Sequence, residues 1–136
     1  MIVADTCLVV HLFNETLLTD IAQKVRQKDA AWILPPLWQE EYANVISKLA
    51  RKESRDVHEV IQHFNYVLNE LQGSEIVVDS RKALKFSIEH KISVYDAHFV
   101  GLALDFDVIL VTEDKEVLKN CKPIARSMHD FLKKES

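Results

Sequence analysis

The chain contains 136 residues, 48% of them hydrophobic, and its formal net charge at pH 7 is −4. This length suits a single domain over residues 1–136 and leaves no room for a second hydrophobic core. The negative charge argues against a protein that coats nucleic acid through bulk electrostatics, and no apolar run approaches the ~20 residues needed to cross a bilayer. We therefore expect a cytoplasmic protein without a membrane segment.

Strand-like apolar runs alternate with helical patterns, which predicts βα units around a parallel sheet. The apolar N-terminus has no basic start, so it is predicted to be a first strand ended by Asp5 rather than a signal peptide. Pro35 and Pro36 stop the second strand, and Gly73 is predicted to cap a helix. The predicted strands are 2–4, 32–34, 75–78, 108–111 and a short edge strand at 123–125. The predicted helices are 17–27, 37–51, 58–71, 80–90, 95–106, one beginning near 115, and a turn or two within 128–133.

Several well-known chemical motifs are absent from the sequence. There is no glycine-rich phosphate loop, no HExxH zinc motif and no GxSxG nucleophile elbow. Cys7 and Cys121 lack the spacing of a zinc site, so we expect reduced thiols. Two basic clusters are interpreted as solvated helix faces, with contact to phosphate as the alternative. The basic residues are Lys48, Arg51, Lys52, Arg55, Arg81, Lys82 and Lys85.

Four acidic residues lie where predicted strands end or predicted helices begin. They are Asp5, Glu41, Asp96 and Asp114. Open α/β sheets bind ligands just beyond the carboxyl ends of their strands. Carboxylates gathered at such an edge repel one another unless they bind protons or a cation, and hard cations such as Mg²⁺ take oxygen ligands. The sequence therefore predicts a metal site assembled from distant parts of the chain.

Each of these acids also has an ordinary structural explanation. Asp5 and Asp114 suit turn or helix caps. Asp96 suits the first turn of a helix, where an acid interacts favourably with the helix dipole by roughly 0.3–1 kcal/mol. Asp79 is a fifth acid at a predicted strand end, and we assign it to capping the helix that begins at Ser80.

Two neighbouring glutamates on one predicted helix are distinguished by the helical periodicity. Glu40 falls opposite the apolar stripe and should face water, whereas Glu41 falls on the border of that stripe. A border acid can reach the edge of the sheet while its helix remains packed. The alternative for Glu41 alone is an ion pair with Lys48 or Lys52.

Four segments, in chain order, resemble the PIN-domain family, in particular the VapC-type toxins of bacterial toxin–antitoxin pairs. They are IVADTCLVV, LPPLWQEEYANVISKL, SVYDAHFVGLAL and LVTEDKEVL. The resemblance spans essentially the whole chain and implies a three-layer α/β/α sandwich with a parallel sheet of four to five strands. It differs at Cys7, where relatives often carry Ser or Asn. Matched to the family's motifs, the acidic quartet is Asp5, Glu41, Asp96 and Asp114, and its polar neighbours are Thr6, Asn44 and Thr112.

The resemblance also implies a function and partners. It implies an endoribonuclease that depends on Mg²⁺ or Mn²⁺ and hydrolyses RNA phosphodiester bonds as the toxin of a toxin–antitoxin pair. Asp5 and Asp96 would be the main metal ligands, with Glu41 and Asp114 completing or supporting the site. A cognate antitoxin protein and a homodimer are the implied protein partners. One or two metal ions, and the identity of the RNA, stay open.

Two other functions remain as alternatives. A receiver-like or phosphatase-like phosphoryl-transfer domain also has an acid at the end of its first strand, but the phosphatase pattern needs a second Asp where Cys7 stands. The other alternative is a catalytically inactive PIN fold that serves as a binding module. Large apolar side chains are candidates for a contact surface, although burial in the core is their commoner fate. These are Trp38, Phe64, Tyr66 and Phe99.

Overall fold

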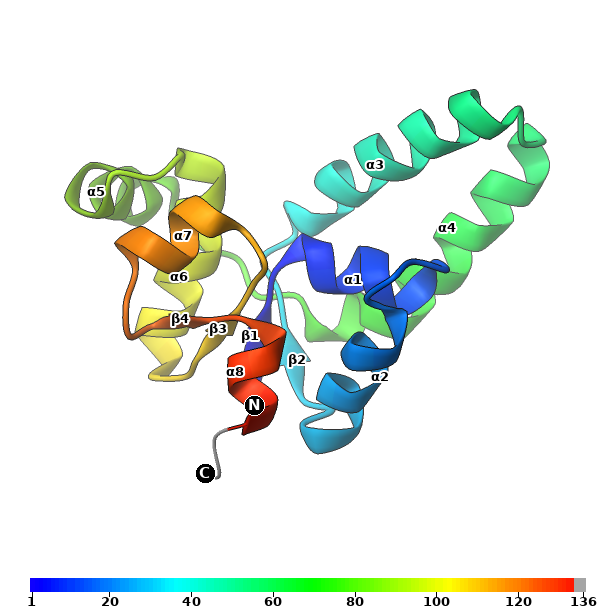
Figure 1. Ribbon diagram of the computed structural model, residues 1–136. Coiled ribbons are helices and arrows are strands. Elements are labelled where there is room, and N and C mark those ends of the chain that lie inside the picture. Colours follow the sequence, from blue (N-terminus) through cyan, green and yellow to red (C-terminus); the bar gives the residue numbers. More distant parts are fainter. Residues whose placement is uncertain (134–136) are drawn as a thin grey trace.

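A sheet of four short parallel strands lies at the centre of the molecule (Figure 1), in a computed structural model that describes residues 1–133. The strand order is β2-β1-β3-β4, and all three pairings are parallel. Because β1 has its sequence neighbour β2 on one side and β3 on the other, the order reverses at β1. Open α/β sheets bind ligands at such a reversal. The strands are β1 (Ile2–Ala4), β2 (Trp32–Ile33), β3 (Leu110–Val111) and β4 (Ala125–Arg126).

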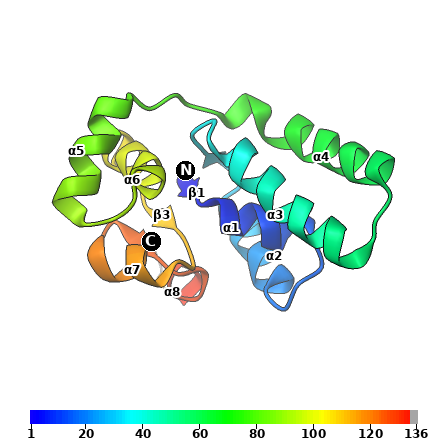
Figure 2. The ribbon, with the colours of Figure 1, turned by 90° about the horizontal axis from the view of Figure 1, so that it is seen from above.

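Helices lie on both sides of the sheet and give the molecule three layers, as the view from above shows (Figure 2). Helices α1 to α4 form one side, and α5, α6 and α7 form the other, while α8 packs against α2. This arrangement confirms the expected α/β/α sandwich with a parallel sheet. The helices are α1 (Thr6–Phe13), α2 (Thr19–Lys28), α3 (Trp38–Glu53), α4 (Val57–Leu71), α5 (Ser80–His90), α6 (Val94–Phe106), α7 (Lys115–Asn120) and α8 (Met128–Lys133).

Two local expectations are wrong, and one helix was not predicted. The apolar run after Asp5, which the sequence left unassigned, forms helix α1, and the Asp5 side chain caps its first turn. The strand expected at 75–78 is reduced to a single parallel bridge between Leu34 and Glu75, after which the chain leaves the sheet for α5. Gly73 does not cap α4 in a left-handed conformation, because α4 continues into a 3-10 turn, η1 (Gln72–Ser74).

The hydrophobic core fills the space on both sides of the sheet. All three residues of β1 are buried, as expected for a central strand covered on both faces. Trp38 and Phe99 are buried in this core, Phe64 is half-buried, and Tyr66 keeps 56% of its surface exposed. Gly101 of α6 brings α5 close, since a Cβ atom there would lie 3.0 Å from the Phe86 ring. Among the described residues, no helix is both long and apolar enough to cross a membrane.

Helices α3 and α4 form a hairpin that projects away from the sheet (Figure 1). A hydrogen-bond junction ties it to α1. The Tyr42 hydroxyl accepts a hydrogen bond from Asn14 Nδ2 at 3.0 Å and lies 2.7 Å from His63 Nε2. Tyr42 is fully buried, and it directly follows Glu41 in the sequence. The hairpin is therefore fixed to α1 at a point next to Glu41, in the first turn of α3.

Candidate active site

Asp5 stands at the carboxyl end of β1, where the strand order reverses, and caps α1. Its Oδ1 accepts a hydrogen bond from the Thr6 backbone N–H at 2.8 Å, and its Oδ2 accepts one from the Thr112 hydroxyl at 2.5 Å. The Cys7 thiol lies 3.7 Å from the same Oδ2. The carboxylate is thus held in one orientation by the two segments that follow β1 and β3.

Thr112 links Asp5 to Asp114. It is fully buried just after β3, and its hydroxyl, which donates to Asp5, also accepts the Asp114 backbone N–H at 3.0 Å. The Asp114 side chain caps α7, because its Oδ1 accepts the backbone N–H groups of Glu116 and Val117 at 2.9 and 3.1 Å. The expectation that Asp114 caps a helix is therefore confirmed. Its Oδ2 accepts no hydrogen bond from any described residue and is available to a ligand.

Glu41 lies in the first turn of α3 and is half-buried, whereas Glu40 is exposed, as the helical periodicity predicts. The Thr6 hydroxyl donates to Glu41 Oε1 at 2.6 Å, which connects α3 to the start of α1. Within residues 1–133, no ion pair joins Glu41 to Lys48 or Lys52. The simpler expectation of an ion pair along α3 is therefore wrong.

Asp96 lies in the first turn of α6, as the sequence predicts. Ser93 caps this helix, and its hydroxyl accepts the Asp96 backbone N–H at 3.0 Å. The Asp96 carboxyl group is half-buried, and the Ser93 side chain is close enough to hydrogen-bond it and lower its pKa.

Burial and neighbouring acids raise the pKa of Asp5 to about 6. Burial is the largest cause, because a desolvated carboxylate is less stable than the neutral acid. The hydrogen bonds from Thr112 and Thr6 lower the pKa, while the charges of Glu41 and Asp114 raise it. The net rise shows that two good hydrogen bonds do not offset the cost of a charge at this position.

The same causes act on two other acids. Burial, followed by the charges of Asp5 and Asp114, raises the pKa of Asp96 to about 6. The pKa of Glu41 is raised, first by burial and then by the charge of Asp96, against lowering contributions from the Thr6 hydroxyl and His98. The acids of the quartet therefore share one electrostatic environment, and no Lys or Arg forms an ion pair with any of them among the described residues.

The donor set fits a hard divalent cation in its chemistry. The quartet supplies only carboxylate oxygens, and Mg²⁺ usually takes one or two carboxylates while it keeps several water molecules. Yet no three His, Cys, Asp or Glu side chains within residues 1–133 are close enough together to hold a metal ion as they stand. The acids are gathered at one edge of the sheet without converging on a point, as mutual repulsion favours.

The polar neighbours of the quartet differ in their contacts. Thr6 and Thr112 each hydrogen-bond an acid, as described above. Asn44 is exposed, and its side chain has no hydrogen bond to a described residue. Asp79 lies outside the quartet, because its carboxylate caps α5 and pairs with Arg81 at 2.8 Å, as expected.

Two residues beside the quartet were not singled out from the sequence. Glu113 donates its backbone N–H to Cys7 Sγ at 3.4 Å, and its side chain accepts the Met128 backbone N–H at 2.8 Å. Burial raises the pKa of the Cys7 thiol well above its usual range, so the thiol stays protonated. His98 places Nδ1 2.8 Å from the Val94 carbonyl oxygen and lies near enough to Glu41 to affect its ionisation. In the sequence, the only signal for His98 is its position two residues after Asp96, and Glu113 has a corresponding signal in its position next to Asp114.

Comparison with known proteins places this chain in a family. No curated protein matches the chain. The structure is similar to the crystal structure of PAE2754 from Pyrobaculum aerophilum, with a TM-score of 0.69 and 25% sequence identity over 96% of this chain and 92% of that one. A family model described as the PIN domain matches residues 2–122, which is most of the chain. The chain therefore belongs to the PIN domain family, whose fold is generally that of a metal-dependent nuclease.

Proposed function

We propose that this protein is an endoribonuclease that uses Mg²⁺ or Mn²⁺, and that it acts as the toxin of a toxin–antitoxin pair. One observation carries the proposal. The pKa values of three half-buried acids from separate segments, Asp5, Glu41 and Asp96, are raised at the reversal of strand order. The negative charge of the exposed Asp114 contributes to the rise at Asp5 and Asp96, and none of the three forms an ion pair with a basic side chain among the described residues. Such an arrangement costs folding free energy, and a divalent cation removes that cost.

The proposed roles follow from the contacts of each acid. Asp5 and Asp96 would hold the ion, because Asp5 is fixed in orientation by its hydrogen bonds and Asp96 lies close enough to Asp5 for their charges to repel. Glu41 and Asp114 would complete or support the site. A bound ion supplies polarisation of the scissile phosphate and lowers the pKa of a water molecule. One carboxylate of the quartet accepts the proton of the attacking water, which adds to phosphorus as the P–O bond to the leaving sugar oxygen breaks.

Cleavage of RNA by the purified protein tests this function directly. We expect Mg²⁺- or Mn²⁺-dependent cleavage that falls on the order of 100-fold in Asp5→Asn and in Asp96→Asn, since each loses a charged oxygen ligand. Asp79→Asn is the matched control, because it also removes a helix-capping acid, but from α5. Cleavage by either site variant at the parental rate would show that the proposed roles are wrong.

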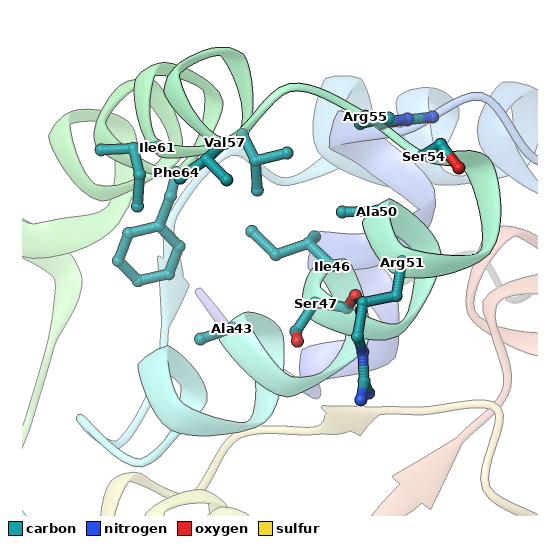
Figure 3. Close-up of a pocket in the computed structure, with 11 residues that line it drawn as sticks. Ala43, Ile46, Ser47, Ala50, Arg51, Ser54, Arg55, Val57, Ile61 and Phe64 are labelled. Atoms are coloured by element: carbon teal, nitrogen blue, oxygen red, sulfur yellow. Dashed lines mark hydrogen bonds between the residues drawn. The ribbon is translucent and has the colours of Figure 1, made fainter.

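An antitoxin partner is supported by a groove between α3 and α4. Its volume is about 510 Å³ and its lining is mainly apolar, as Figure 3 shows for Ile46, Ile61 and Phe64. Arg51 and Arg55 also line it. An apolar groove suits the apolar face of an amphipathic helix, and the arginines favour acidic residues beside that face. We propose that an acidic amphipathic helix of the antitoxin binds here.

A homodimer is supported by the outward face of α5. Leu84 and Ile88 lie one turn apart and remain 53% and 70% exposed, while Ala83 on the opposite side is buried against the core. Lys85 and Glu89 flank this face. In an antiparallel pairing of two copies of α5, each lysine would meet the partner's glutamate, so the face is complementary to itself. We propose that a second copy of the chain covers it.

The alternative of an inactive binding module is favoured by one observation, the absence of a formed three-ligand cluster within residues 1–133. Calorimetry with millimolar Mn²⁺ separates the two functions. Heat of binding that disappears in Asp96→Asn supports the nuclease. A parent protein that binds no metal would favour the module.

A further inference from the structure

We infer that Glu75 is a positioning residue for Glu41, an inference that rests on the nuclease function proposed above. Glu75 Oε2 accepts a hydrogen bond from Trp38 Nε1 at 2.7 Å and another from Gln39 Nε2 at 2.5 Å. Both donors belong to the first turn of α3, the turn that also carries Glu41. One carboxylate outside the quartet therefore holds the start of the helix that presents a member of the quartet.

Helix α3 begins without a side-chain cap, unlike the other helices that start at an acid of the quartet. Its N-cap residue is Leu37, which makes no side-chain hydrogen bond to the helix. The other acids of the quartet lie at helix starts with side-chain caps from Asp5, Ser93 and Asp114. In α3, the carbonyl oxygens of residues 35–37 accept the backbone N–H groups of the first turn. The side chains of the fully buried Trp38 and of Gln39 add a tie from this turn to Glu75, on a different segment of the chain.

Glu75 itself is held by the edge of the sheet. Leu34, which follows β2, pairs with Glu75 in a parallel bridge. Around this bridge, the Leu34 N–H donates to the Ser74 carbonyl oxygen at 3.2 Å, and the Ile76 N–H donates to the Leu34 carbonyl oxygen at 2.9 Å. The Glu75 backbone is thereby fixed to the sheet, and its carboxylate transfers that position to α3.

The geometry of the helix carries this position on to Glu41. Residues three apart in an α-helix lie on nearly the same face, so the anchored Trp38 sets where Glu41 points. Thr6 holds Glu41 from the other side through its hydroxyl. The charge of Asp96 opposes both, because like charges favour rotation of Glu41 toward solvent. Without Glu75, this repulsion acts on a first turn that has lost its tie to the edge of the sheet.

The test compares Glu75→Ala with Glu75→Gln, which keeps an acceptor oxygen for Trp38. We expect Glu75→Ala to weaken Mn²⁺ binding about 10-fold, the low end for loss of an outer hydrogen bond, and Glu75→Gln to restore most of it. The value of kcat should fall with little change in KM. Gln39→Ala, which removes one donor only, should give a smaller loss of the same kind. Glu70→Ala, an exposed acid on α4, is the matched control.

A metal-free measurement tests the same inference without activity. Amide hydrogen exchange at Glu41 and Tyr42 should be faster in Glu75→Ala than in the parent, and close to parental in Glu75→Gln. If Glu75→Ala lowers only the melting temperature, and leaves exchange and Mn²⁺ affinity parental, the positioning role is overturned.

A double variant decides whether Glu75 acts through Glu41. In a Glu41→Gln background, Glu75→Ala should cause no further loss of Mn²⁺ affinity, because the group that it positions is already gone. A full additional loss would overturn the inference. A parent protein that cleaves no RNA and binds no Mn²⁺, but whose α3 exchange responds to Glu75→Ala, identifies failure of the proposed function rather than of the anchoring contact.

Discussion

At the scale of single residues, the site is defined by carboxylates that are costly to ionise. Asp5 and Asp96 both have a pKa raised to about 6, whereas an unperturbed aspartate titrates near 3.8. Between these two pH values the folded chain binds more protons than the unfolded chain. The free energy of unfolding therefore falls as pH rises from 3.8 to about 6. Above that pH, these two groups no longer change it.

The same titration of Asp5 and Asp96 should increase metal affinity as pH rises, whereas it lowers the free energy of unfolding. Because a cation binds ionised carboxylates, we expect the Mn²⁺ affinity to rise several-fold between pH 5 and about 7 and then to level off. Calorimetry across this range checks the prediction. An affinity that changes no more between pH 5 and 7 than between pH 7 and 8 would contradict the assignment of Asp5 and Asp96 as ligands.

The cost of the Asp5 charge also predicts a gain in stability when it is removed. Asp5→Asn should raise the free energy of unfolding of the metal-free protein at pH 7.5 by about 1 kcal/mol. The gain is smaller than the full cost of the charge, because the variant also loses one of the hydrogen bonds that Asp5 accepts. The gain should shrink at pH 4.5, where Asp5 is already protonated. Urea unfolding at the two pH values measures it.

Asp79→Asn provides a control of opposite sign. Hydrogen bonds from Arg81 lower the pKa of Asp79 to about 2, so its charge stabilises the fold. Its contribution is present above the unfolded pKa of 3.8 and is lost as pH falls toward 2. Asp79→Asn should therefore destabilise at pH 7.5. Because both pH 7.5 and pH 4.5 lie above 3.8, the effect of Asp79→Asn should change little between them. If the effect of Asp5→Asn is equally independent of pH, side-chain packing rather than charge dominates at Asp5.

At the scale of helices and strands, contacts between elements determine how closely the layers approach. Helices α5 and α6 pack through Gly101, where an added Cβ would lie 3.0 and 3.2 Å from two atoms of the Phe86 ring. Such a contact is tight enough that the ring must shift. The small side chain of residue 101 therefore sets the distance between these helices.

Gly101→Ala should lower the free energy of unfolding by about 1 kcal/mol, because overpacking at 1–3 kcal/mol exceeds the gain in helix propensity. Gly73→Ala is the matched control, since nothing lies within 4 Å of a Cβ there, and it should be neutral or slightly stabilising. Urea unfolding of both variants gives the comparison. Adding Phe86→Leu should relieve the loss in Gly101→Ala, and equal stability of the two single variants would contradict the close approach.

At the scale of the whole molecule, two apolar faces lie on opposite sides of the sheet. One is the groove between α3 and α4, and the other is the outward face of α5 (Figures 1 and 2). Exposed apolar patches of this kind mark interaction surfaces. Their separation allows a partner protein and a second copy of the chain to bind at the same time.

A pair of matched isoleucine variants separates the two surfaces. Ile61→Glu in the groove should abolish binding of a synthetic acidic amphipathic helix and leave the mass of the protein in solution unchanged. Ile88→Glu on α5 should convert the proposed dimer to a monomer and leave binding of that helix unchanged. Both side chains are more than half exposed, so neither change should unfold the protein. Ultracentrifugation measures the mass in solution, and calorimetry measures binding of the helix. If Ile61→Glu disrupts the dimer and Ile88→Glu abolishes helix binding, the two surfaces have the opposite roles.

The sequence predicted those features that depend on local patterns. The apolar periodicity of α3, α5 and α6 identified these helices, and it distinguished the exposed Glu40 from the half-buried Glu41. The parallel sheet followed from the alternation of strands and helices. Helix capping predicted Asp79 and Asp114 at the starts of α5 and α7. These features are set within one or two turns of the chain, where spacing alone carries the information.

Only the tertiary structure decided what depends on distant contacts. The run after Asp5, which the sequence left unassigned, becomes helix α1, and the segment at 75–78, expected to be a strand, pairs with the sheet through Glu75 alone. The sequence alone indicated that acids lie at strand ends and helix starts, since that is a local property. The partial burial of Asp5, Glu41 and Asp96 and the repulsion between them arise only when distant segments of the chain meet. The same is true of the contact between Glu75 and α3. Desolvation and Coulomb interactions depend on distance in space rather than on distance along the chain.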